Sequence, residues 1–279
     1  MSHFVTTAWL DSQLDADDLL VLDASWYLPA HNRNAAQEYE EGHIPHARRF
    51  DLDAVSDHSS PLPHMLPTPA DFARAMGALG ISRDSRVVIY DGMGLFSAAR
   101  VWWTLQIFGH PFVKVLQGGA PRWRQENRPW TAEKTIIKQT TYPVPVIQEG
   151  VATRAHMVQW SADQSMQMVD ARAADRFRGE APEPRPGLAS GHIPHSKNLP
   201  FGQVVQEGAL KDKDAILQAF EKAGIDPTKP VATTCGSGVT AAILSIALAE
   251  IGLPAAALYD GSWSEWGGDP SLPVATGPA

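Results

Sequence analysis

Short apolar runs alternate with longer segments of helical character along the whole chain. Runs of four or five residues, bounded by turn-forming residues, are typical of buried strands. Such runs lie at 20–23, 87–90 and 113–116, and again in the second half at 166–169, 231–234 and 255–259. The pattern therefore predicts six strands, three in each half of the chain.

The intervening segments predict helices. One begins after Thr68, a good N-cap residue, with Pro69 at the first helical position and Asp71 in the first turn. The segments near 96–108 and 240–251 are also long enough for helices. Strands that alternate with helices indicate the α/β class, with mainly parallel sheets covered by helices on both faces. Ligands of such sheets bind at the carboxyl ends of strands. Asp91 and Cys235 both lie there.

The chain repeats itself at a slowly drifting offset, from 149 down to 142 residues. Along the chain, LLVLDAS around Asp23 resembles MQMVDAR around Asp170, GHIPH at 42–46 recurs at 191–195, VVIYDGMG ending at Gly94 resembles VATTCGSG ending at Gly238, and LQGG ending at Gly119 resembles LYDG ending at Gly261. Four ordered matches indicate a duplicated domain. We expect a first domain at 1–136, an extended proline-containing linker at 137–149 and a second domain at 150–279.

Composition and charge narrow the range of functions. The 279 residues are 44% hydrophobic and 19% charged, with a net charge of −8. An acidic chain is a poor partner for nucleic acid or an anionic membrane. A single cysteine allows neither an internal disulfide nor a thiolate-rich zinc site. The first residues lack the features of a signal peptide, and no apolar run approaches the ~18 residues of a membrane span. We therefore expect a cytoplasmic protein.

Cys235 follows the apolar run 231–234 in the sequence CGSGVT, just before a predicted helix. Gly236 and Gly238 allow successive N–H groups to point inward as an anion-binding nest, which would stabilise a thiolate or a persulfide. The alternative is a structural cysteine on a turn. The first copy carries Asp91 at this place, with the same glycines. The glycine loop therefore belongs to the fold, and only the second copy adds a thiol.

Two reactions use a cysteine in an anion nest. Phosphatases of the Cys-x5-Arg type need a guanidinium at the end of the loop, where this chain has Ala241. Sulfur transfer needs a thiolate that accepts a sulfur atom, holds it as a persulfide and passes it on. The loop favours the second reaction.

The duplication, the loop CGSGVT at 235–240 and the segment YDGSWSEW at 259–266 resemble the tandem-domain rhodanese superfamily. Within it, the loop is similar to that of the 3-mercaptopyruvate sulfurtransferases, because Gly236 and Ser237 are uncharged where thiosulfate-using rhodaneses carry basic residues. The resemblance implies two rhodanese-like domains, the first inactive, and sulfur transfer from 3-mercaptopyruvate through a Cys235 persulfide. The backbone amides of Gly236, Ser237, Gly238, Val239 and Thr240 would form the cradle. No metal or organic cofactor is expected.

The resemblance also implies substrate-binding arginines in the segment 170–187. Arg176 and Arg185 match the two arginines of the family, and guanidinium groups suit the carboxylate and ketone of mercaptopyruvate. Arg172 and Arg178 are rivals, of which Arg172 fits a structural role better. EAPEPRPG at 180–187 reads as a charged surface loop able to close over the site.

In the family, an aspartate and a histidine of the first domain approach the loop serine. These map onto Asp53, His64 and Ser237, a trio that could relay the proton of the substrate thiol. The alternatives are a turn cap for Asp53, a loop histidine for His64, and a direct hydrogen bond from Ser237 to substrate or persulfide. The repeated GHIPH motif, which could suggest a metal site, fits a structural turn better.

Two other functions stay open. One is thiosulfate:cyanide sulfurtransferase activity, which the uncharged loop disfavours, because a dianionic substrate should favour nearby cations. The other is a non-catalytic module that carries a persulfide to a protein partner. We expect a monomeric or weakly associating chain that uses a small-molecule donor and a thiol, thioredoxin or cyanide acceptor.

Overall fold

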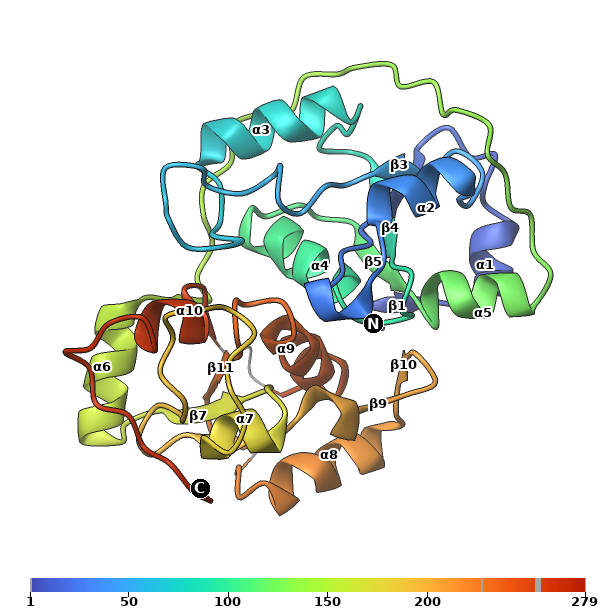
Figure 1. Cartoon of the computed structure of the whole chain (residues 1–279). Helices are drawn as coiled ribbons and strands as arrows, with labels where there is room; N and C mark the ends of the chain where they lie inside the picture. The colour runs from blue at the N-terminus through green and yellow to red at the C-terminus, as the bar shows by residue number, and fades with distance from the viewer. Residues whose placement is uncertain (1, 227, 254–256, 279) are drawn as a thin grey trace. The chain divides into compact units, whose positions relative to one another are not determined.

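The computed structural model describes residues 2–226, 228–253 and 257–278, which form two compact units. The first unit consists of Met1–His58, Leu66–Gln148 and Glu207–Ala209, and the second of Ser59–Met65, Glu149–Gln206 and Leu210–Ala279. The segment Ser59–Met65 therefore belongs to the second unit, although it lies early in the sequence. Figure 1 shows both units as sheets with helices packed against them.

The first unit contains five strands, five α-helices and a 3₁₀ helix among its described residues. In chain order they are β1 Phe4–Val5, α1 Thr7–Asp11, β2 Leu19–Asp23, η1 Pro29–His31, α2 Ala35–Glu41, β3 Arg48–Arg49, α3 Pro69–Ala78, β4 Arg86–Tyr90, α4 Ala98–Ile107, β5 Val113–Leu116 and α5 Gly119–Gln125.

The second half of the chain repeats this order of strands and α-helices, with the 3₁₀ helix placed after β8 and a two-stranded hairpin (β9–β10) added, of which Glu207–Ala209 belong to the first unit. Its elements are β6 Val151–Ala152, α6 Arg154–Asp163, β7 Gln167–Asp170, α7 Ala174–Arg178, β8 Lys197–Asn198, η2 Phe201–Gln203, β9 Val205–Gln206, β10 Ala209–Leu210, α8 Lys213–Lys222, β11 Val231–Thr234, α9 Ala241–Glu250, β12 Leu258–Tyr259 and α10 Ser262–Trp266.

Both five-stranded sheets are parallel and have corresponding strand orders. The first is β1-β5-β4-β2-β3 and the second β6-β12-β11-β7-β8. The register pairs Asp23 with Tyr90 in one and Asp170 with Thr234 in the other. Each aspartate thus lies beside the strand that leads into a glycine loop. The predicted α/β class and the two-domain duplication are confirmed.

The strand and helix predictions fall within one or two residues of the observed bounds where the chain is described. The capping argument holds for α3, because Thr68 Oγ1 accepts from the amide of Asp71 at 3.2 Å and Pro69 opens the helix. The strand predicted at 255–259 is described only from residue 257 and begins at Leu258; residues 255 and 256 lie outside the described part of the chain.

The segment expected as a linker at 137–149 has no regular secondary structure and packs on the first unit. Near the end of α3, the amide of Thr140 donates to the carbonyl oxygen of Gly77 at 3.0 Å, and its hydroxyl donates to that of Ile81 at 2.9 Å. Tyr142 is buried, and its ring meets Phe72 edge-on at 5.6 Å. Burial of one aromatic side chain of this size contributes about 1.5–3 kcal/mol. The segment is therefore anchored to the first unit.

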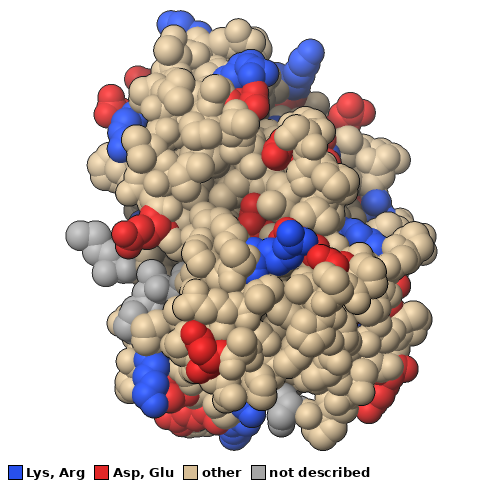
Figure 2. Space-filling view, turned by 90° about the vertical axis from the view of Figure 1, so that its left-hand side faces the viewer, with Lys and Arg blue, Asp and Glu red and all other residues tan. Residues whose placement is uncertain are grey.

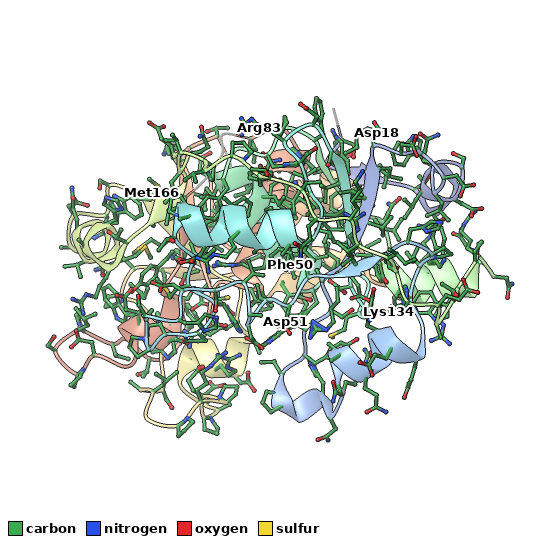
Figure 3. The ribbon with its side chains drawn as sticks, turned by 90° about the horizontal axis from the view of Figure 1, so that it is seen from above. Asp18, Phe50, Asp51, Arg83, Lys134 and Met166 are labelled. Atoms are coloured by element: carbon green, nitrogen blue, oxygen red, sulfur yellow. The ribbon has the colours of Figure 1, made fainter. Side chains whose placement is uncertain are left out.

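The chain after β3 is tied back to the end of β2. Phe50, labelled in Figure 3, is buried, and its amide donates to the carbonyl oxygen of Asp23 at 2.8 Å. On the face shown in Figure 2, acidic and basic side chains lie in small mixed groups, without an extended basic stripe among the described residues. None of the described helices has the length and apolar character needed to cross a membrane.

Candidate active site

Cys235 lies at the carboxyl end of β11, the strand beside Asp170 in the second sheet. All four residues of β11 are buried, and Cys235 itself is 2% exposed. The next five residues form the loop, and α9 begins at Ala241. Gly238 has φ +75°, a left-handed conformation that glycine adopts without strain. The cysteine is therefore fixed between a buried strand and a helix N-terminus.

The segment that contains α10 holds this loop in place. The Cys235 carbonyl accepts from the amide of Trp263 at 2.9 Å, and the Gly236 carbonyl accepts from the amide and hydroxyl of Ser264 at 2.9 and 2.6 Å. The amide of Cys235 donates to Ser262 Oγ at 3.3 Å. These bonds engage the carbonyl groups of Cys235 and Gly236, and the amides of the following loop residues are not used by the α10 segment.

The amides of residues 236–240 donate to no acceptor within the described part of the chain. Buried or partly buried amides in native proteins nearly always have a partner, whether protein, water or ligand. Together with the N-terminus of the ten-residue helix α9, they form a cradle suited to an anion. The predicted cradle residues Gly236, Ser237, Gly238, Val239 and Thr240 directly follow the cysteine, and their role in holding an anion stays a prediction.

The hydroxyl of Ser237 contacts two other predicted site residues, His64 and Arg185. Its Oγ lies 3.0 Å from His64 Nδ1, and Arg185 Nη2 donates to it at 3.4 Å. The side chains of His64 and Ser237 are both buried. His64 reaches this position because Ser59–Met65 clusters with the second unit. The contact could pass a proton between a bound thiol and the imidazole.

Asp53 lies in the first unit, after β3. Its Oδ2 accepts from Trp26 Nε1 at 3.0 Å. An indole donor stabilises the ionised carboxylate. Its place in a trio with His64 and Ser237 stays a prediction.

Arg176 projects from α7 toward the loop. A Cβ built on Gly236 would lie 3.2 Å from Arg176 Nη2, so the absence of a side chain at Gly236 lets the guanidinium approach the loop backbone. The guanidinium is held by Glu183, to which both Nε and Nη2 donate. A cation thus lies beside a loop that carries no charge of its own.

The two rival arginines have other partners. Arg172 is buried, ion-pairs with Asp170 and Glu183 at 2.7 Å each, and lies 4.3 Å over the ring of Trp263. Its contacts fit the structural role expected for it. Arg178 is half-exposed and pairs with Glu180 at 2.6 Å. Within the described part of the chain, Arg176 and Arg185 are the two of these four arginines that lie against the loop, at Gly236 and Ser237.

Glu183 is a site residue that sequence reasoning missed. We expected 180–187 to be a charged surface loop, yet the Glu183 side chain is 2% exposed and bridges Arg172 and Arg176. The available signal was a glutamate between two prolines, eleven residues after one arginine and seven after another. Charge alternation alone gives no indication that such a carboxylate turns inward.

The GHIPH motif forms the same turn in both units. His43 and His192 each bond through Nδ1 to a backbone carbonyl, of Tyr39 and Phe177, at 2.8 Å. His46 and His195 both have φ +65°. Among the described residues, no group of three or more His, Cys, Asp or Glu side chains could hold a metal ion. The motif is a repeated structural turn.

The corresponding loop of the first unit is filled by its own side chain. The Asp91 carboxylate accepts from the amides of Met93, Phe96 and Ala98 at 2.8, 2.7 and 2.9 Å. Burial raises the pKa of Asp91, and these backbone hydrogen bonds oppose that rise. Arg33 lies over this loop as Arg176 does over the other, with Nη2 3.0 Å from a Cβ built on Gly92.

Comparisons with known proteins identify the family of the chain. The family model of the rhodanese-like domain matches residues 6–126 and 153–269. The 3-mercaptopyruvate sulfurtransferase of Escherichia coli K12 is 42% identical over 97% of each chain. The mitochondrial thiosulfate/3-mercaptopyruvate sulfurtransferase 1 of Arabidopsis thaliana is 43% identical over 97% of this chain and 77% of its own.

A solved structure gives the same result. The crystal structure of the Escherichia coli enzyme, described as a 3-mercaptopyruvate sulfotransferase of rhodanese fold, matches with a TM-score of 0.85 at 39% identity, over 94% of this chain and 99% of that one. Two family-model matches, near-full-length relatives and a shared fold lead to one conclusion: the chain belongs to the tandem-domain rhodanese family, among the 3-mercaptopyruvate sulfurtransferases.

Proposed function

We propose that this chain transfers sulfur from 3-mercaptopyruvate to a thiol, thioredoxin or cyanide through a persulfide on Cys235, with release of pyruvate. The observation that carries the proposal is the position of Cys235, at the end of a buried strand beside five unengaged amides and an arginine from outside the loop. The relatives named as 3-mercaptopyruvate sulfurtransferases support the choice of donor.

In the first half-reaction the Cys235 thiolate attacks the sulfur of the substrate. A sulfur–sulfur bond forms and the carbon–sulfur bond breaks, so its electron pair moves to the carbon and the ketone oxygen as the enolate of pyruvate. The proton of the substrate thiol passes to that carbon, through Ser237 and His64 in this proposal. The products are pyruvate and Cys–S–S⁻, which the amides of residues 236–240 would stabilise.

The arginines would hold the substrate during this step. Arg176 and Arg185 offer planar donors for the carboxylate and for the oxygen on which negative charge develops. Glu183 fixes the plane of Arg176. In the second half-reaction an acceptor thiolate or cyanide attacks the outer sulfur and releases the Cys235 thiolate. No resident cofactor takes part in either step of the proposal.

The acceptor, the cytoplasmic location and the monomeric state also belong to the proposal. A free cysteine as sulfur carrier suits a reducing compartment, in which a persulfide can be discharged by thiols. The structure and the relatives establish the coarser statement, a sulfurtransferase of the rhodanese family that acts on a small-molecule donor.

A paired-donor assay on the wild type and Cys235→Ser tests the proposal. We expect turnover to favour 3-mercaptopyruvate over thiosulfate, because the loop supplies no cation for a dianion. Mass spectrometry after donor exposure should show a gain of about 32 Da, one sulfur atom, on Cys235. Cys235→Ser should lose both pyruvate release and the mass gain. Undiminished pyruvate release in Cys235→Ser would exclude the nucleophile, and a strong preference for thiosulfate would exclude the donor.

A further inference from the structure

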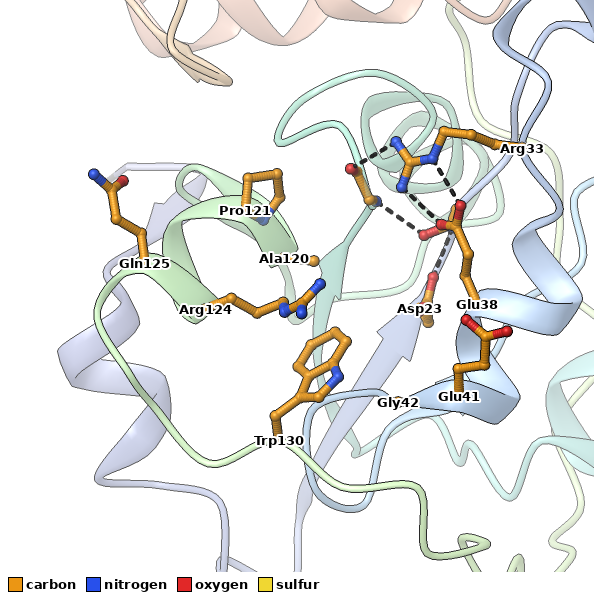
Figure 4. A pocket seen from close by; sticks show the side chains of 12 residues that line it. Asp23, Arg33, Glu38, Glu41, Gly42, Ala120, Pro121, Arg124, Gln125 and Trp130 are labelled. Carbon is orange, nitrogen blue, oxygen red and sulfur yellow. Dashed lines mark hydrogen bonds and ion pairs between the residues drawn. The ribbon is translucent and has the colours of Figure 1, made fainter.

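A pocket of about 920 Å³ lies within the first unit, at the carboxyl ends of β2 and β4 (Figure 4). Its charged lining residues are Asp23, Arg33, Glu38, Glu41 and Arg124, and its other walls include Ser25, Gly42, Pro121 and Trp130. None of these residues takes part in the sulfur-transfer proposal. The pocket is therefore a separate feature of the duplicated domain.

The second unit shows what occupies the corresponding place there. By the repeat offsets, Asp23 corresponds to Asp170 and Ser25 to Arg172. The Arg172 guanidinium fills the space beside Asp170, with three donor contacts to that carboxylate at 2.7–3.2 Å. It also donates to the carbonyl of Gly191 at 2.8 Å, and Gly191 corresponds to Gly42 of the pocket wall.

The first unit keeps the acceptors and lacks the guanidinium. Asp23 is 5% exposed, and its Oδ1 accepts from the amide of Ser25 at 2.8 Å. No Lys or Arg of the described residues pairs with it. Burial raises the pKa of Asp23, because its carboxylate has left water without gaining a cation. A cationic group in the pocket would offset this cost.

The opposite wall carries a cation without a carboxylate. The Arg124 guanidinium lies 5.4 Å over the ring of Trp130 and forms no ion pair with any described carboxylate. Figure 4 shows it extending toward the middle of the pocket, across from Asp23 and Glu38. Arg33, in contrast, is matched, since it pairs with Glu38 through two bonds of 2.7 Å. Two carboxylates of the pocket, Asp23 and Glu41, thus have no cationic partner among the described residues, and Asp23 is the buried one of the two. Arg124 is the unmatched cation on the facing wall.

We propose that this pocket binds a small zwitterion of the arginine class, with its guanidinium on Asp23 and its carboxylate on Arg124. The guanidinium takes the position that the Arg172 side chain occupies in the second unit, where the same backbone surroundings already accept that group. The carboxylate of the ligand forms a bidentate ion pair with the guanidinium of Arg124. Trp130 supplies a flat surface next to both groups.

Isothermal titration of the full chain with L-arginine, agmatine and L-citrulline tests the proposal. L-Citrulline is neutral where arginine is cationic, so it should bind at least about 30-fold more weakly, as expected for loss of one partner of a buried charge pair. Agmatine lacks the carboxylate and should bind more weakly than arginine. Arg124→Gln should abolish the difference between agmatine and arginine. Equal affinity for citrulline and arginine, or no binding of arginine to the wild type, would overturn the proposal.

Two variants locate the site and a third controls for charge. Ser25→Arg gives the first unit the side chain that the second unit has at Arg172. This new guanidinium should itself fill the space beside Asp23 and abolish the binding of free arginine. Asp23→Asn should weaken arginine at least about 30-fold. Asp84→Asn removes an exposed carboxylate of the same unit and should leave binding unchanged. Sulfur transfer in Ser25→Arg reports that the chain has folded, and unchanged arginine affinity in that folded variant contradicts the assigned position.

Discussion

The loops after β4 and β11 share one backbone design and differ in what lies between their amides. In the first, the Asp91 carboxylate accepts three amides of its own loop. In the second, Cys235 stands at the same place, and the amides of residues 236–240 have no acceptor among the described residues. An arginine held by a glutamate, Arg33 or Arg176, lies beside the first glycine of each loop.

This difference separates what the fold requires from what the chemistry requires. The carboxylate of Asp91 is the internal stand-in for an anion, so the nest is a stable feature that needs negative charge inside it. In the second loop a neutral thiol supplies no negative charge, so the charge must come from a thiolate, a persulfide or a bound substrate. The side chain inside the first loop therefore indicates which kind of group the second loop is suited to receive.

The largest expected effect comes from Arg176→Gln. Loss of the guanidinium beside the open loop should lower kcat/KM for 3-mercaptopyruvate about 100-fold or more, since it removes a donor to developing charge. Arg178 lies two residues further along α7 and pairs with the half-exposed Glu180, so Arg178→Gln should change kcat/KM by no more than about twofold. Arg33→Gln, over the filled loop, should do the same. Steady-state release of pyruvate measures all three, and an equal loss in Arg33→Gln would break the comparison.

The two glutamates that hold these arginines should differ in their effect on stability. Glu183 is 2% exposed and serves two arginines, so Glu183→Gln should destabilise the chain by about 3 kcal/mol. Glu38 is 34% exposed, and Glu38→Gln should cost less than about 1 kcal/mol. Calorimetry should show a drop in Tm of several degrees for the first variant and of about two degrees at most for the second. Equal drops would contradict the buried clamp assigned to Glu183.

The smallest expected effect is a partial rescue of Asp91→Ala by sulfate, and it tests the comparison of the two loops most directly. Asp91→Ala opens the first nest and leaves three amides without an acceptor, at a cost of about 2–3 kcal/mol. Because an open nest binds oxyanions, millimolar sulfate should restore part of the lost stability. The wild type and Asp84→Ala correct for the general stabilisation by sulfate. If sulfate raised the Tm of all three proteins equally, the nest would not be an anion site.

Local pattern predicted much of the fold, because strand and helix signals depend on neighbouring residues. The runs 113–116 and 231–234 became strands of those bounds, and Thr68 capped α3. The repeat predicted two like domains, and the loop around Cys235 predicted where chemistry would lie. The sequence also predicted that charge near the loop must come from arginines outside it.

Other features depend on contacts between residues distant in the chain. Glu183 looked like part of a solvated loop, and only the packing of α7 against that loop turned its carboxylate inward between two arginines. The clustering of Ser59–Met65 with the second unit brought His64 to Ser237 across 173 positions. The Asp91 side chain turned back on its own loop. By itself, then, the sequence determined the elements, the duplication and the position of the single cysteine in its glycine loop. The tertiary structure alone decided which charges are buried together, because burial and pairing of charges depend on three-dimensional neighbours that no local pattern encodes.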